Sequence, residues 1–236
     1  MYIGEMTRDD FKASADRDPI VIVPWGACEA HGPHLPLDTD TIQPVYVATE
    51  VSRRLQNTLV APPVNYALHS STRDMPGTLT ISFDTVRSIA YDLVISLWRQ
   101  GVDRTVILAG HAGSGHISAI LEGCKKAVRE TGTQVIFLSD WHISEDYGAC
   151  GDDDGHAGCV ETSRILAIRP DLVGSIDRDA GHFEHTYRIL RDGSTCLPDG
   201  YQGRISEATA DLGASINDYI VETIIGIIQH DFELAA

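Results

Sequence analysis

Carboxylates and imidazoles crowd one short segment near the start of the chain, residues 29–40. The side chains that could do chemistry there are Glu29, His31, His34, Asp38 and Asp40. Carboxylate oxygens and imidazole nitrogens together form a donor set that suits zinc, manganese or iron. The segment is equally compatible with a polar turn in which Asp38 or Asp40 caps the following helix. It therefore predicts a metal site only if other parts of the chain contribute.

A second segment, residues 109–116, reads Ala-Gly-His-Ala-Gly-Ser-Gly-His and follows an apolar run. Its glycines would let the backbone approach a ligand closely, so a phosphate cradle is one interpretation. That interpretation is disfavoured, because the segment lacks Gly-Lys-Ser/Thr and its glycines are not spaced as Gly-x-Gly-x-x-Gly. His111 is the candidate ligand here. His116 falls inside the next predicted helix, and we expect it to be structural.

A third segment, residues 155–163, reads Gly-His-Ala-Gly-Cys-Val-Glu-Thr-Ser and contains His156 and Glu161. Taken alone, Glu161 is best explained as an acid that interacts favourably with the dipole of the helix it begins. The acidic run at residues 152–154 is most simply a solvated loop. The three segments together repeat one pattern of acid and histidine at successive element boundaries, which favours an enzyme.

Alternating strands and helices are predicted to position these segments. Apolar, β-branched runs predict strands at residues 19–24, 57–64, 104–109 and 133–138, with a shorter one at 78–82. Helical patterns predict helices at residues 41–55, 84–100, 114–131, 159–168 and 206–230, and a polar, hairpin-like stretch at 181–201. We therefore predict an α/β fold over residues 1–236 as one domain, with a mostly parallel central sheet and helices on both faces. Ligands bind such sheets at the carboxyl edge of the strands.

The net charge bears on the partners of the chain, and its cysteines bear on its cellular location. The net charge of −16 over 236 residues makes nucleic acid or an anionic membrane surface an unfavourable partner. The cysteines, 5 in number, show no pairing pattern, so we expect reduced thiols and a cytoplasmic location. The first ten residues contain no basic region followed by an apolar core, so no signal peptide is expected, and no apolar run is long enough for a membrane span.

The same segments resemble the motifs of the creatininase family of metal-dependent amidohydrolases. Residues 26–41, Gly-Ala-Cys-Glu-Ala-His-Gly-Pro-His-Leu-Pro-Leu-Asp-Thr-Asp-Thr, resemble its opening motif. Its later motifs are matched in order by residues 75–78, 110–113 and 156–163. Residues 200–203 and 208–210 resemble its C-terminal segment. The resemblance covers almost the whole chain and implies the fold of that family.

A binuclear metal site is what the resemblance implies, with two divalent ions of zinc, manganese or iron per chain. Glu29 and His111 would bind one ion. His31 and Glu161 would bind the other, and Asp40 would bridge them. Two divalent ions close together hold a bridging water and lower its pKa, which gives a hydroxide near neutral pH.

Amide hydrolysis is the activity that the resemblance implies. His156 matches the catalytic histidine of the family and would protonate the leaving amine as a general acid. The substrate would be a small cyclic amide or a formamide, whose C–N bond the bridging hydroxide would open. A peptidase of the mycofactocin-precursor type is the alternative within the enzyme class. A catalytically silent relative that binds a small molecule is the alternative outside it, but all five ligands and His156 are present.

Two departures from the family bear on the substrate. Creatininase itself has a liganding Glu where this chain has Gly113, so creatinine loses support as the substrate. Residues 69–75, His-Ser-Ser-Thr-Arg-Asp-Met, replace the Ser and the Glu-His pair often found there, and this stretch should line the pocket. Arg73 could pair with a carboxylate or phosphate of the substrate, although a surface arginine is the simpler interpretation. The roles of His34, His69 and His142 stay open.

A homo-oligomer, with a hexamer as the implied form, is also expected from the resemblance. The apolar C-terminal helix adds only weak support, because a monomer could bury it equally well. The expected partner of the chain is otherwise a small-molecule substrate, with neither nucleic acid nor membrane involved.

Overall fold

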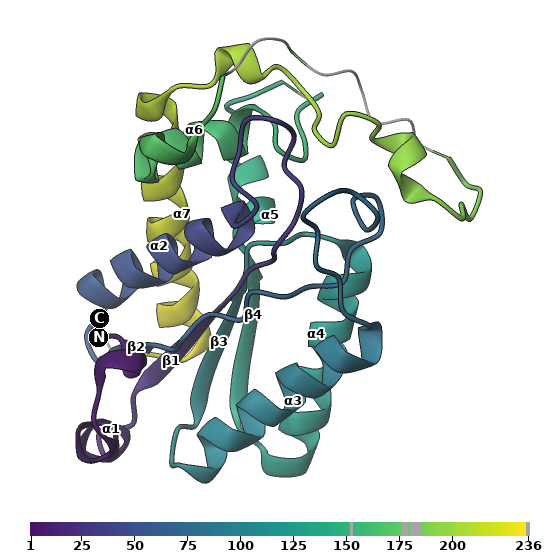
Figure 1. The fold of residues 1–236 in the computed structure, drawn as a ribbon. Coiled ribbons are helices and arrows are strands. Elements are labelled where there is room, and N and C mark those ends of the chain that lie inside the picture. Colours follow the sequence, from purple (N-terminus) through teal and green to yellow (C-terminus); the bar gives the residue numbers. More distant parts are fainter. Residues whose placement is uncertain (152, 176–178, 180–185, 235–236) are drawn as a thin grey trace.

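A parallel sheet forms the centre of the molecule (Figure 1). The structure, a computed structural model, describes residues 1–151, 153–175, 179 and 186–234. The strands of the sheet in this part of the chain are β1 (Ile20–Trp25), β2 (Thr58–Val60), β3 (Arg104–Ala109) and β4 (Gln134–Ser139). They lie in the order β2-β1-β3-β4, and every neighbouring pair is parallel. All four carboxyl ends therefore meet at one edge.

Helices cover both faces of this sheet (Figure 1). One face packs against α2 (Thr39–Arg54), α5 (Asp140–Glu145), α6 (Cys159–Ile168) and α7 (Ala210–Asp231). The other packs against α1 (Arg8–Ala15), α3 (Phe83–Arg99) and α4 (Ser114–Thr131). Short 3-10 helices lie at η1 (Ile3–Glu5), η2 (Pro170–Leu172), η3 (Gly193–Cys196) and η4 (Ile205–Glu207). The predicted α/β class with a parallel sheet and two helical layers is confirmed.

The sequence of β1 explains why both layers are needed. Successive side chains of a strand point to opposite faces of the sheet. Ile20 and Ile22 accordingly join the apolar core under α2 and α7, while Val21 and Val23 join the core under α3 and α4. A run of β-branched residues that is buried on both faces is typical of a central parallel strand.

Several local predictions differ from the structure. Residues 78–82 form a single bridge between Ala67 and Thr80 rather than a strand. The helix predicted from residue 84 begins at Phe83, because the side chain of Ser82 accepts the cap hydrogen bond from the backbone of Thr85. The last helix begins at Ala210, after η4. Part of the hairpin-like stretch at 181–201 lies outside the described residues, and the rest contains η3.

A buried ion pair joins three helices beneath the carboxyl edge. Arg164 of α6 donates to Asp140 of α5 at 2.7 Å and to the side chain of Asn217 of α7 at 2.9 Å. Arg164 and Asp140 are each 1% exposed. Burial raises the pKa of Asp140, and the Arg164 guanidinium opposes that rise. The pair fixes α6, which also carries Glu161.

Removing one partner of this pair should destabilise the fold strongly. We expect Arg164→Leu to lower the free energy of unfolding by about 3–5 kcal/mol, because it leaves the Asp140 carboxylate buried without a counter-charge. Urea denaturation measures the change. Arg54→Leu is the matched control, since Arg54 pairs with the exposed Asp218 and Glu222, and it should cost about 1 kcal/mol or less. Equal losses in the two variants would contradict this view of the pair.

No helix in the described ranges combines the length and the apolar character that crossing a membrane requires.

Candidate metal centre

The acid and histidine clusters meet at the carboxyl edge of the sheet. Glu29 and His31 lie in the connection that follows β1, and Asp40 lies in the first turn of α2. His111 follows β3, and Glu161 lies in the first turn of α6. The parallel topology thus brings together residues that are up to 132 positions apart in the sequence.

Close packing of α2 against the strand ends sets the place of Asp40. The Cα of Gly110, next to His111, faces the backbone of Asp40 so closely that a Cβ there would lie 2.1 Å from the Asp40 carbonyl oxygen. A Cβ on Gly26 would lie 2.4 Å from the Cα of Thr41. Only glycine allows this approach at both strand ends. The first turn of α2 is therefore held directly between the ends of β1 and β3.

Asp40 lies between the two histidines of the cluster. Its Oδ1 is 3.0 Å from Nε2 of His31, and its Oδ2 is 3.2 Å from Nδ1 of His111. Glu29 Oε2 lies 2.8 Å from the same His111 nitrogen, and Glu161 Oε2 lies 3.8 Å from His31 Nε2. All five side chains are buried. The structure thus brings the five predicted ligands together around one shared carboxylate.

Backbone carbonyls orient both imidazoles. His31 Nδ1 lies 3.0 Å from the carbonyl oxygen of Glu29, and His111 Nε2 lies 3.2 Å from that of Leu68. A carbonyl oxygen only accepts, so each of these nitrogens carries the hydrogen. The opposite nitrogens, which face Asp40, are then the ones that can bind a metal. A metal-ligating histidine commonly donates its other N–H in this way.

The electrostatics of the cluster couple its acids to its bases. Burial alone would raise the pKa of Glu29, but the imidazoles of His111 and His156 lower it to about 2. Burial alone would lower the pKa of His111, yet the carboxylates of Glu29 and Asp40 raise it to about 10. The pKa of Asp40 is likewise held well below its usual range against the effect of burial, mainly by His31. Carboxylates that stay ionised in a buried site attract cations strongly.

The donor atoms fit a metal site. Three groups, each with ligand atoms within 4.8 Å of one another, can be drawn from the described residues: Glu29, His69 and His111; Glu29, His31 and His156; and His31, Asp40 and Glu161. Glu29 Oε2 is buried, and ring nitrogens face it: His111 Nδ1 at 2.8 Å and His69 Nε2 at 3.7 Å. Mixed carboxylate and imidazole donors of this kind suit zinc and manganese.

His156 lies beside this cluster but is held differently. Its Nε2 donates to the carbonyl oxygen of Ala30 at 2.8 Å, and its ring lies 4.2 Å from that of His31, centroid to centroid. Ala157, at a positive φ of 53°, then turns the chain so that its N–H donates to Glu161 Oε2 at 2.6 Å. A non-glycine residue in this conformation is uncommon and is often found at functional sites. The turn places His156 and Glu161 together.

The turn that carries His156 is supported from two sides. The side chain of Asp154 accepts from the backbone of Cys159 at 2.6 Å and of Val160 at 3.1 Å, at the start of α6. Burial raises the pKa of Asp154 to about 6. The backbone N–H of Gln202 donates to the carbonyl oxygen of His156 at 2.9 Å. Gln202, which belongs to the motif at residues 200–203, thus helps to hold the candidate catalytic histidine in place.

A cavity of about 460 Å³ opens onto the cluster. His156, Trp141 and Gln202 line it, together with Ser70, Ser71 and Thr72. The prediction that residues 69–75 line the pocket therefore holds for 70–72. Arg73 instead lines a neighbouring cavity, which also contains Arg188 and Arg191. Trp141 was not identified from the sequence as a cavity residue, because the short helix α5 that carries it was not predicted.

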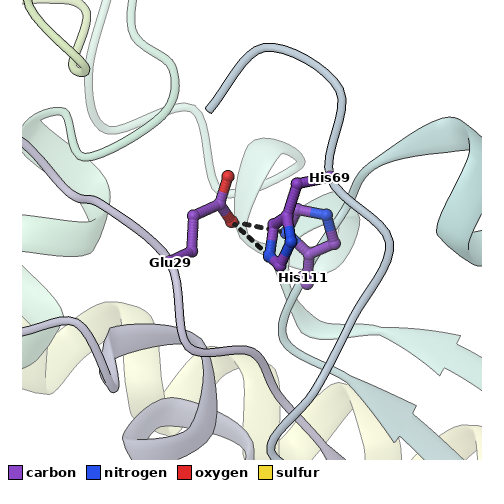
Figure 2. A group of neighbouring side chains, drawn as sticks. All are labelled: Glu29, His69 and His111. Carbon is purple, nitrogen blue, oxygen red and sulfur yellow. Dashed lines mark ion pairs between the residues drawn. The ribbon is translucent and has the colours of Figure 1, made fainter. Parts of the chain in front are cut away.

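Four other histidines differ in their surroundings. His34 is buried and lies 3.0 Å from the hydroxyl of Thr162, while His142 is exposed on α5. His116 is buried inside α4, as predicted. His69 is buried beside Glu29 and His111 (Figure 2). Burial lowers the pKa of His69 to about 4.

The cysteines correct one expectation. Cys150 and Cys159 form a disulfide in the structure, whereas all five cysteines were expected to be reduced. Cys28, Cys124 and Cys196 are free. The disulfide closes the loop that carries His156, because Cys159 is the first residue of α6. Their spacing in the sequence did not indicate this pairing, since the two cysteines approach only through the turn of that loop.

Comparison with known proteins gives consistent matches along the chain. A family model described as "Creatininase: Creatinine amidohydrolase" matches residues 4–228. The creatinine amidohydrolase of Pseudomonas putida is 32% identical over 257 residues, which cover 98% of this chain and 97% of the relative. The mycofactocin precursor peptide peptidase of Mycobacterium ulcerans (strain Agy99) is 30% identical over 243 residues, covering 96% and 91%.

Solved structures give the same picture. A manganese form of creatininase superposes with a TM-score of 0.89 at 28% identity, covering 98% of both chains. A Zn-Zn form of a creatininase variant superposes with a TM-score of 0.87 at 27% identity, again covering 98% of both. The chain is thus similar along nearly all its length to proteins solved with manganese and with zinc.

Proposed function

Because this chain belongs to the creatininase family of hydrolases, we propose that it is a metal-dependent amidohydrolase. Its substrate would be a small cyclic amide or a formamide, and the bond cleaved would be a C–N bond. The observation that carries the proposal is the position of Asp40, whose two oxygens lie 3.0 and 3.2 Å from His31 and His111. A carboxylate in this position can serve two cations at once.

The contacts in the cluster support one assignment of ligand roles. Glu29 and His111 would hold one ion, because their donor atoms face each other at 2.8 Å. His31 and Glu161 would hold the other, and Asp40 would belong to both. Bound divalent ions would lower the pKa of a coordinated water and polarise the amide carbonyl. Zinc, manganese and iron all accept this donor set.

The other residues of the centre would bind the substrate and move its proton. His156 lines the cavity next to the ligands, so its imidazole can protonate the departing nitrogen. Its Nε2–H is engaged by Ala30, which leaves Nδ1 as the nitrogen that exchanges the proton. Ser70 and Ser71, which line the same cavity, offer hydroxyls to orient the amide.

A peptidase is the second candidate, supported by the similarity to the mycofactocin precursor peptide peptidase. A cavity of about 460 Å³ suits a small molecule or the end of a short peptide. A catalytically silent binding protein is less well supported, because no predicted ligand is missing from the cluster.

Metal analysis joined to a substrate screen tests the proposal. Purified protein should contain two divalent ions per chain and should hydrolyse members of a panel of cyclic amides and formamides. Treatment with a chelator should abolish turnover, and added zinc or manganese should restore it. Turnover confined to peptides would favour the peptidase. Protein that binds no divalent ion would overturn the metal-dependent mechanism altogether.

A homo-oligomer, with a hexamer as the family form, is proposed as well. The C-terminal helix does not strengthen this proposal, because Ile216, Ile220, Ile224 and Ile228 are buried in the core of the subunit. We expect light scattering to give a mass several times that of the 25.7 kDa chain, near six times for a hexamer. A particle of one chain at micromolar concentration would contradict the expectation.

A further inference from the structure

One buried histidine at the centre has no role in the function proposed above. His69 is 3% exposed, and neither ring nitrogen has a hydrogen-bond partner among the residues that the structure describes. Buried polar groups are normally paired, and a neutral imidazole has one donor and one acceptor to satisfy. An imidazole left without partners in so buried a place is therefore costly unless a ligand completes it.

His69 points at the same carboxylate oxygen as His111. In Figure 2 both rings lie on the same side of Glu29, and their centroids are 4.8 Å apart. Nε2 of His69 lies 3.7 Å from Glu29 Oε2, and Nδ1 of His111 lies 2.8 Å from it. Ligands of one zinc ion each lie about 2.0–2.2 Å from the metal, so their donor atoms stand roughly 3–4 Å apart. The two distances to Glu29 are close to this separation, and the ligand atoms of all three side chains lie within 4.8 Å of one another.

The segment that carries His69 is itself fixed to the centre. The backbone of His69 donates to the hydroxyl of Thr80 at 3.0 Å, and the backbone of Ile81 donates to the carbonyl oxygen of Ala67 at 2.9 Å. Between these anchors, the carbonyl oxygen of Leu68 accepts from Nε2 of His111. One three-residue segment thus orients His111 through its backbone and supplies a second imidazole from the next position.

We propose that His69 is a further metal ligand, which shares one ion with Glu29 and His111. This inference rests on the proposed metal-dependent function and assigns it one more residue. With Asp40, which belongs to both ions in the proposed function, this ion would have two imidazole and two carboxylate ligands, all of them donor types that zinc accepts. Gly113, two residues after His111, has no side chain and so supplies no ligand to this ion.

The test counts ions and measures their affinity without using activity. Metal-free wild type, His69→Gln and His69→Ala are titrated with zinc against a chromophoric chelator. Loss of partners that merely orient a ligand weakens metal binding about 10–100-fold, so loss of a direct ligand should cost at least about 100-fold. We expect this loss at one of the two sites, with the other unchanged. The visible spectrum of the cobalt form should also change, because one nitrogen donor is removed.

His116→Gln is the matched control. His116 is as buried as His69, and its ring lies 5.2 Å from that of His111, centroid to centroid. It accepts from the backbone of Leu68 at 3.4 Å but belongs to none of the groups of possible ligands. We expect this variant to bind two ions with wild-type affinity. Thermal unfolding of the metal-free proteins reports whether each variant is folded.

The outcomes separate the two proposals. Folded His69 variants that bind both ions as tightly as wild type would overturn the role of His69 and leave the proposed function intact. Weakening of both sites to the same extent, or an equal effect of His116→Gln, would mean that His69 acts by packing and would also overturn it. A wild-type protein that binds no ion would overturn both proposals at once.

Discussion

Asp40→Ala should remove both metal ions and all measurable turnover. Asp40 is the acid whose two oxygens face two different histidines, His31 and His111. Without it, two cations would face each other with one negative charge fewer between them, so neither would be held as tightly. Metal content after dialysis and the hydrolysis rate are the two measurements. Both are expected to fall together.

Asp38→Ala is the control for that variant. Asp38 lies two residues earlier, at the N-cap of α2, but it is exposed and makes no side-chain cap hydrogen bond. We expect it to keep both ions and its turnover, with a stability change of about 1 kcal/mol or less. If Asp40→Ala kept one tightly bound ion, the shared position of this carboxylate would be wrong, even if turnover were lost.

His156→Ala should separate chemistry from metal binding. General acid catalysis contributes typically about 10²–10⁴-fold, and we expect turnover to fall within that range while both ions stay bound. The reason is that His156 lines the cavity and bonds to the carbonyl oxygen of Ala30, outside the five-residue cluster. Metal content and the hydrolysis rate of the variant are measured side by side.

Two results would contradict this division of roles. If the variant lost an ion in step with turnover, His156 would be a metal ligand. Its position beside Glu29 and His31 is compatible with that role. Full activity would place the general acid elsewhere. His142→Ala and His34→Ala then distinguish the next candidates, one exposed on α5 and the other buried beside Thr162.

The scaffold was predictable because its strands are strongly patterned. The β-branched residues of β1 and β3 are typical of strands in a sheet that is buried on both faces. Helices α4 and α6 end at the residues that the sequence predicts. Short elements were missed. Helix α5 has only six residues, too few to show a period. Helix α1 did carry a readable signal, the capping box of Thr7 and Asp10.

The candidate site also contains residues that the sequence indicates and one that it does not. Each of the five predicted ligands belongs to a local motif that combines histidine with glycine or with acids, so the sequence could indicate it. His69 could not be placed in this way, because its neighbours Glu29 and His111 lie 40 and 42 residues away and its own segment contains neither helix nor strand. Its proximity to them is a product of tertiary packing alone.

Part of the long connection between β2 and α3 lines the cavity but does not belong to the apolar core that holds the fold. Ser70, Ser71 and Thr72 line the cavity from this irregular segment, while the apolar cores lie between the sheet and the helices on its two faces. Substitutions at Ser70 or Ser71 can therefore reshape what the cavity accepts without disturbing the packing that holds the fold. Such a chain can diverge in substrate while its architecture stays constant, so proteins that share this fold can hydrolyse different compounds.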